Sequence, residues 1–231
     1  PLFGAIIKPK SGLNMEQYMS IVKDMIYGGA DFIKEDEIMA QNLYLPLEKR
    51  VEAVEHLKNI SGWKGFFAYC INADPMELLG NIKKIYYHTC TPNIVGGCHI
   101  NFWSGLGAYT TARGFDIATH YQRSGIRILT DPSNKYSVSW PVLVKLGCMA
   151  GIDSMHVGML GGYYPEGESE EETLEAISIC EKYDVIPSLS CGMNPVLARE
   201  IKERIGNNFM ASVGGWLHTG DSLIKKVKEM R

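Results

Sequence analysis

The sequence of 231 residues predicts an α/β fold, a single (β/α)8 TIM barrel over residues 1–231. Short apolar or β-branched runs alternate with amphipathic stretches of about ten to fifteen residues, the pattern of βα units around a parallel sheet. Eight such units follow one another without an obvious linker, and 45% hydrophobic residues can fill one large core. A doubly wound sheet shows the same alternation and remains the alternative.

Four units are predicted in the first half of the chain. In the third unit Asp74 can cap the helix and Pro75 suits its first turn. The Gly-rich segment of the fourth unit predicts a shorter helix. The strands, each with the segment that follows it, are Leu2–Lys8 with Met15–Tyr27, Asp31–Lys34 with Glu48–Asn59, Gly65–Ile71 with a helix from Asp74, and Ile94–Asn101 with the Gly-rich segment.

The second half of the chain repeats the pattern more cleanly. A long loop separates strand from helix in the fifth unit, and an acidic loop does so in the sixth. The predicted pairs are Phe115–His120 with Val138–Met149, Ser154–Met159 with Glu171–Tyr183, Val185–Ser190 with Pro195–Ile205, and Phe209–Val213 with Ser222–Met230.

Charge and composition argue against several classes of protein. The net charge of −3, without a basic stripe or a recognised motif, gives no reason to expect nucleic-acid binding. No apolar stretch approaches the ~18 residues of a membrane span, and no leader peptide opens the chain. The six cysteines are scattered, with no C-x-x-C pair, which is typical of a reducing, cytoplasmic compartment.

The predicted strand Asp31–Lys34 ends in four consecutive ionisable residues, Lys34 to Glu37. Such groups are costly to bury unless they contact one another or a metal ion. Carboxylate oxygens suit a hard cation such as Mg²⁺. The run therefore indicates a metal site, with a solvated loop after a buried strand as the alternative.

Other polar residues also fall at predicted strand ends, which a barrel brings to one mouth. Each has a structural explanation when taken alone. The histidines could bond neighbouring carbonyls, the lysines could lie on the surface, and the glycines could form plain turns. Their joint placement favours a shared site formed by Lys8, Lys34 to Glu37, His120, His156, Ser190 and Gly214.

Two motifs resemble the carboxy-terminal barrel domain of the RuBisCO large-chain superfamily. Ile7-Lys8-Pro9-Lys10-Ser11-Gly12-Leu13 is similar to that family's I-K-P-K-x-G-L, and Gly28 to Glu37 is similar to G-G-x-D-F-x-K-D-D-E. Both occur in the right order and spacing, and the resemblance extends over essentially the whole chain.

The resemblance implies that Lys34 reacts with CO₂ to form a carbamate, which holds Mg²⁺ together with Asp36 and Glu37. The implied cofactors are thus Mg²⁺ and CO₂ as the lysine carbamate, and Glu35 is not a ligand. The implied catalytic residues are Lys8, Lys10 and His120. Those implied to bind substrate or its phosphate are His156, Ser190, Gly192, Gly214 and Gly215.

Two departures from the family pattern weigh against carboxylation. Tyr163 falls where carboxylating members have a lysine, and Tyr121 replaces an arginine that grips the second phosphate. The segment from Phe115 to Ser139 is closer to the non-carboxylating RuBisCO-like proteins. We therefore expect Mg²⁺-dependent enolisation or isomerisation of a phosphorylated, sugar-type carbonyl substrate. The alternatives are a ribulose-1,5-bisphosphate carboxylase, or a fragment of one, and a non-catalytic barrel that binds a phosphorylated metabolite.

The family also predicts how the chain is organised with other parts. Its barrel normally follows an amino-terminal domain of about 100–150 residues, which is absent from this sequence. The chain is therefore expected to be either a fragment or a stand-alone barrel. Paired active sites in the family predict a homodimer or a larger homo-oligomer.

Overall fold

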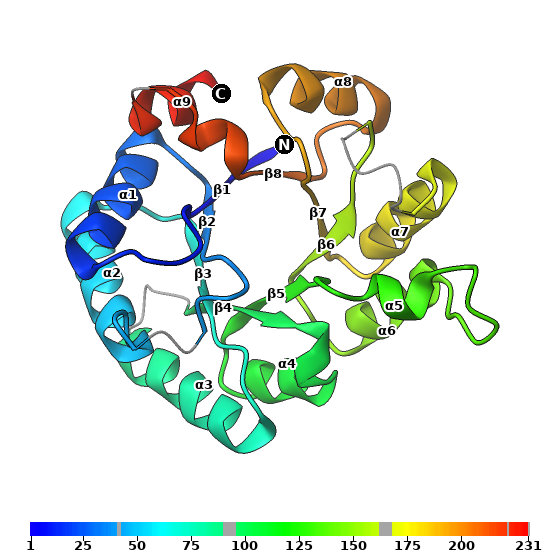
Figure 1. The fold of residues 1–231 in the computed structure, drawn as a ribbon, viewed down its shortest axis with the longest axis horizontal. Helices are drawn as coiled ribbons and strands as arrows, with labels where there is room; N and C mark the ends of the chain where they lie inside the picture. Colours follow the sequence, from blue (N-terminus) through cyan, green and yellow to red (C-terminus); the bar gives the residue numbers. More distant parts are fainter. Residues whose placement is uncertain (41–42, 90–95, 162–167, 221, 231) are drawn as a thin grey trace.

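In the computed structural model the chain is a closed barrel of eight parallel strands, β1 to β8, in sequence order (Figure 1). The structure describes residues 1–40, 43–89, 96–161, 168–220 and 222–230. This confirms the predicted (β/α)8 fold and excludes the doubly wound sheet. The strands are β1 Leu2–Ile6, β2 Phe32–Lys34, β3 Phe66–Cys70, β4 Gly97–Asn101, β5 Ala118–Gln122, β6 Ser154–Gly158, β7 Ile186–Leu189 and β8 Met210–Val213.

Helices form a ring outside the strands (Figure 1). Two short 3₁₀ segments, η1 Phe102–Ser104 and η2 Gly215–His218, follow β4 and β8. The α-helices are α1 Met15–Gly28, α2 Leu47–Ser61, α3 Pro75–Thr89, α4 Gly107–Arg113, α5 Arg127–Thr130, α6 Trp140–Met149, α7 Glu170–Lys182, α8 Pro195–Ile205 and α9 Leu223–Glu229. Among the described residues, no helix is both long enough and apolar enough to cross a membrane.

Local signals explain where these helices begin and end. Asn14 and Gln17 form a capping box at the start of α1, and Gly29 ends the helix in a left-handed conformation. Ser169 and Glu172 form the same box at α7. The long loop predicted after β5 contains the short helix α5, whose four residues are too few to show a helical period.

The barrel interior is apolar at one end and polar at the other. Phe32, Ala68 and Met210 form a small buried cluster of their own, with Phe66 and Ile186 packed against it. Side chains alternate across a strand, so the next inward positions lie two residues further along. Those positions carry Lys34, Cys70, Ser188 and Ser212, and His120 and His156 lie in the cavity near the ends of β5 and β6. The polar layer therefore faces the carboxyl ends of the strands, where barrel active sites lie.

Candidate active site

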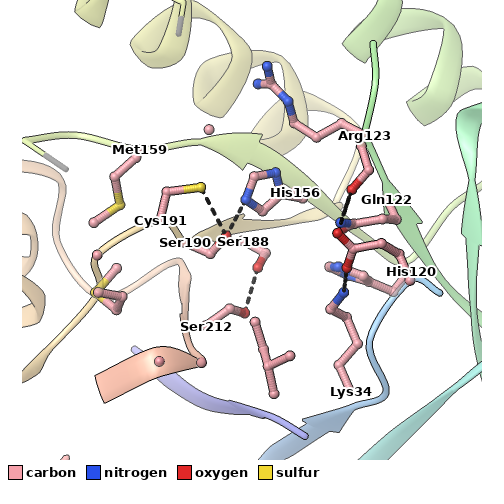
Figure 2. A pocket seen from close by; sticks show the side chains of 18 of the residues that line it. Lys34, His120, Gln122, Arg123, His156, Met159, Ser188, Ser190, Cys191 and Ser212 are labelled. Atoms are coloured by element: carbon pink, nitrogen blue, oxygen red, sulfur yellow. Dashed lines mark hydrogen bonds and ion pairs between the residues drawn. The ribbon is translucent and has the colours of Figure 1, made fainter. Parts of the chain in front are cut away.

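A cavity of about 460 Å³ opens at the carboxyl ends of the strands. Its walls come from the ends of β1, β2, β5, β6, β7 and β8 and the loops that follow them, so residues far apart in sequence meet there (Figure 2). The predicted site residues that line it are Lys8, Lys34, Glu37, His120, His156, Ser190, Gly192, Gly214 and Gly215. Two predicted residues are not among the lining. Lys10 is exposed to solvent outside the cavity, and Asp36 is buried behind the residues that line it.

Three residues of the ionisable run, Lys34, Glu35 and Asp36, are buried, which excludes the solvated-loop alternative for them. Glu35 points away from the cavity. Its carboxylate pairs with the Arg50 guanidinium and accepts hydrogen bonds from the Tyr18 hydroxyl at 2.5 Å and the Cys70 N–H at 2.7 Å. Glu35 is therefore fully engaged in the core.

Asp36 and Glu37 have different basic partners. The Asp36 carboxylate forms an ion pair with the Lys8 ammonium across the ends of β1 and β2. Oε2 of Glu37 lies 3.6 Å from Nζ of Lys34, and its Oε1 accepts a hydrogen bond from Ser124 Oγ at 2.8 Å. Burial raises the pKa of the Glu37 carboxyl, but the Lys34 ammonium and hydrogen bonds outweigh burial and lower it overall. Glu37 is thus an anion at neutral pH.

Carboxylates and imidazoles alone do not make a metal site here. Within the part of the chain that the structure describes, no three His, Cys, Asp or Glu side chains are grouped to hold a metal ion. A metal at this position would need a further oxygen ligand beside Asp36 and Glu37.

The two strand-end histidines contact serine hydroxyls. His120 Nδ1 lies 2.9 Å from Ser154 Oγ. His156 Nε2 is hydrogen-bonded to Ser190 Oγ, as Figure 2 shows. Burial lowers the pKa of both imidazoles well below its ordinary value, and the nearby cations Lys34 and, for His156, Arg123 add to this. Both rings are therefore neutral at pH 7, and each keeps one nitrogen lone pair.

The floor of the cavity contains two serines that we did not predict from the sequence. Ser188 Oγ and Ser212 Oγ lie 2.7 Å apart and bridge β7 and β8 (Figure 2). Strand periodicity could have found them, because each lies two residues before a predicted site residue, Ser190 or Gly214.

Glycines after β7 and β8 give the cavity an open main-chain wall. Gly192 has φ +94°, and Cys191 beside it has φ +77°, so the turn after β7 is left-handed and favours glycine. A Cβ added at Gly215 would meet no atom within 4 Å, and at Gly214 only side-chain atoms of Lys8 and Ile6 from 3.6 Å. Main-chain N–H groups in such turns can bind anionic oxygens.

Of the two residues that depart from the family pattern, the structure describes Tyr121 but not Tyr163. Tyr121 lies outside the barrel, in the core beneath the helices, where its ring stacks on Tyr109 with centroids 5.2 Å apart. Strand alternation directs it away from the cavity that its neighbour His120 faces. Tyr163 lies outside the described residues.

Arg123 lines the cavity, but its charge is already matched. Its guanidinium lies 4.2 Å from the centroid of the Trp140 ring and forms an ion pair with Glu168. It also donates a hydrogen bond to the Val157 carbonyl at 3.3 Å. Arg123 therefore does not offer a free positive charge in place of the missing arginine.

Cations, carboxylates, neutral imidazoles and open main chain thus meet at the carboxyl mouth of a (β/α)8 barrel. This arrangement defines a barrel protein with a polar, ion-rich site suited to a small, oxygen-rich anion.

A family model described as the ribulose bisphosphate carboxylase large chain, catalytic domain, matches residues 1–220. The chain therefore belongs to the RuBisCO large-chain family, as its two motifs predict.

Relatives in this family include carboxylases and RuBisCO-like proteins. The chain is 26% identical to a ribulose bisphosphate carboxylase of Archaeoglobus fulgidus, over 93% of this chain and 54% of that protein. It is 30% identical to that of Halothiobacillus neapolitanus, over 74% of this chain and 39% of that protein. A solved rubisco-like protein from Burkholderia fungorum is 25% identical, with a TM-score of 0.86, over 100% of this chain and 59% of that one. The chain thus spans about half the length of the curated relatives it matches.

The dimeric archaeal Rubisco from Hyperthermus butylicus has the same fold. It superposes with a TM-score of 0.82 at 24% identity, over 100% of this chain and 58% of that chain.

Proposed function

We propose that the chain binds Mg²⁺ through Asp36, Glu37 and a carbamate formed from Lys34 and CO₂. The donor chemistry fits, because carbamylation would turn the Lys34 amine into an anionic oxygen ligand beside the Glu37 carboxylate, and Mg²⁺ prefers such oxygens. Nζ of Lys34 lies 3.6 Å from Oε2 of Glu37, so the new group would form beside an existing ligand.

The proposed reaction is enolisation or isomerisation of a phosphorylated, sugar-type carbonyl compound. Bound Mg²⁺ would stabilise negative charge on the carbonyl oxygen while the neighbouring carbon loses a proton. In the tautomer in which Nδ1–H of His120 donates to Ser154 Oγ, Nε2 holds the lone pair and can take that proton. Lys8 is the second candidate for proton transfer, since it lines the cavity beside Asp36. Lys10 is exposed outside the cavity, so its proposed catalytic role has the weakest support.

The glycine-rich wall after β7 and β8 is proposed to hold the phosphate. The main chain at Gly192, Gly214 and Gly215 would donate hydrogen bonds to phosphate oxygens, and the paired His156 and Ser190 would add side-chain contacts.

The choice of reaction rests on one observation, the ion pair between Arg123 and Glu168 in the cavity wall. Two arginines, Arg123 and Arg127, line the cavity, and the guanidinium of Arg123 is paired with Glu168. Tyr121, which replaces the family's phosphate-gripping arginine, faces away from the cavity. This reduced positive charge favours a substrate with less negative charge than a bisphosphate. The names of the relatives favour the carboxylase alternative.

Calorimetric titration with Mg²⁺, with and without bicarbonate, tests the metal site. We expect bicarbonate to tighten binding and Lys34→Ala to abolish that effect, while the exposed control Lys64→Ala behaves as wild type. Mg²⁺ binding without any dependence on bicarbonate would remove the carbamate.

A second measurement separates the three candidate functions. Incubation with ribulose-1,5-bisphosphate and labelled CO₂ should fix no label. Label recovered in a three-carbon acid would establish the carboxylase instead. Failure to bind Mg²⁺ under any condition would favour the non-catalytic barrel.

We also propose that the chain forms a homodimer or a larger homo-oligomer. The solved relatives include the dimeric Rubisco named above and an octameric Rubisco from Pyrococcus horikoshii. Light scattering coupled to size exclusion measures the assembly directly, and a monomeric mass would contradict this proposal.

A further inference from the structure

Glu37 is held at both ends, by its main chain and by its carboxylate. The Asn72 side-chain amide donates to the Glu37 carbonyl oxygen at 3.0 Å. The Ser124 hydroxyl donates to Oε1 of the carboxylate at 2.8 Å. Asn72 follows β3 and Ser124 follows β5, so two loops remote in sequence fix one residue.

The two residues that hold Glu37 are themselves connected through the end of β4. The Asn101 N–H donates to Asn72 Oδ1 at 2.6 Å, and the Asn101 side-chain amide donates to the Ser124 carbonyl at 3.2 Å. The Trp103 indole donates to the same carbonyl at 3.1 Å. These hydrogen bonds form a closed network that links Glu37, Asn72, Asn101 and Ser124.

The direction of the hydrogen bonds at Ser124 is fixed by chemistry. An ionised carboxylate can only accept, so the Ser124 hydroxyl must donate its proton to Glu37. The Gln122 side-chain nitrogen can only donate, and it lies 2.8 Å from Ser124 Oγ. With both roles of the hydroxyl used, its orientation is determined.

The two oxygens of Glu37 therefore face different partners. Oε1 is bound by Ser124, whereas Oε2 is turned toward Nζ of Lys34. We infer that Ser124 is a positioning residue for the proposed metal site: its hydrogen bond to Oε1 keeps Oε2 of Glu37 turned toward Lys34. The inference rests on the proposed function, because it assigns the role of Oε2 as a ligand to that metal.

The test is the affinity for Mg²⁺, measured by calorimetry in bicarbonate buffer. Partners that orient a metal ligand typically contribute 10- to 100-fold in affinity. We therefore expect Ser124→Ala to weaken Mg²⁺ binding by about that factor. Ser124→Thr keeps the hydroxyl and should bind within about threefold of wild type, since the donor is retained. Ser137→Ala, an exposed serine outside the cavity, is the matched control and should bind as wild type.

Unfolding of the metal-free variants, followed in parallel, separates positioning from a purely structural role. A structural role predicts loss of stability in Ser124→Ala without loss of Mg²⁺ affinity in the folded protein. Gln122→Met serves as a second variant if Ser124→Ala does not fold, because it removes the donor that orients the hydroxyl, and it should also weaken binding.

The possible failures are distinguishable. Wild-type affinity in folded Ser124→Ala, or in Gln122→Met where that variant replaces it, overturns the role of Ser124 and leaves the metal site standing. Absence of Mg²⁺ binding in the wild type overturns both.

Discussion

The Glu35 carboxylate contacts the Arg50 guanidinium in the core, with both side chains fully buried. The first of three consecutive acidic residues is thereby turned away from the cavity. Arg50 also donates to the main-chain carbonyls of Leu45, at 2.8 Å, and Met39, at 3.1 Å. The Arg50 side chain thus holds in place both Glu35 and the main chain of the segment between β2 and α2.

We predict that Arg50→Met destabilises the protein by about 3–5 kcal/mol, because Glu35 is left as a buried charge without its cation. Urea denaturation at neutral pH measures the loss. Lys49→Met is the control, since Lys49 pairs with Glu52 on the surface and should change stability by at most about 1 kcal/mol. A similar small change in Arg50→Met would contradict the role assigned to the pair.

Stability should fall as the pH drops below about 6.5, the ordinary pKa of histidine. His99 is fully buried, and within the described part of the chain neither ring nitrogen has a hydrogen-bonding partner of good geometry. Burial, then the charge of Lys34 and repulsion from His120, lower its pKa well below 6.5, and a weaker attraction to the Glu35 main chain does not reverse this.

Stability falls with falling pH because, below pH ~6.5, the unfolded chain takes up a proton on this ring while the folded protein does not. His99→Leu should therefore reduce the slope of stability against pH by up to about 1.4 kcal/mol per pH unit on the acidic side. Urea titrations between about pH 5 and pH 7.5 measure it. The exposed His56→Leu should leave the slope unchanged, and an unaltered slope in His99→Leu would refute the prediction.

Tyr121→Phe should preserve or increase stability. The Tyr121 hydroxyl is buried and has no hydrogen-bonding partner among the residues that the structure describes, and burial raises its pKa. Removing an unsatisfied buried hydroxyl is expected to gain about 1 kcal/mol. Thermal unfolding gives the change, with Tyr109→Phe as the control, because its hydroxyl donates to the Ile100 carbonyl at 2.7 Å and its loss should destabilise. Destabilisation by Tyr121→Phe would mean that the hydroxyl has a partner.

Glu168→Gln should increase the affinity of the cavity for inorganic phosphate. Loss of this carboxylate leaves the Arg123 guanidinium without its matching charge, and a free guanidinium binds phosphate strongly. We expect an increase of roughly tenfold, or about 1.4 kcal/mol, in a calorimetric titration. Glu170→Gln removes an exposed partner of Arg204 and should have no effect. Equal phosphate affinity in folded Glu168→Gln would show that Arg123 does not reach the ligand.

The order of the elements and the meeting of site residues at one mouth were predictable from the sequence, because the barrel topology brings all strand ends together. The partners of the ionisable groups were not. Arg50 and Glu168 lie 15 and 45 residues from the groups they bind, and nothing local marks those contacts. Tyr121 shows the opposite case. Its position next to His120 invited a role in the site, although alternation along β5 already placed it on the other face.

The division of the barrel interior has a practical consequence for protein engineering. The buried cluster of Phe32, Ala68 and Met210 lies one layer below the polar groups of the cavity. Improved packing at that end can compensate for a destabilising change at the mouth without altering any group that faces a ligand. Variants of the site can therefore be studied on a reinforced scaffold, so that loss of binding is not confused with loss of fold.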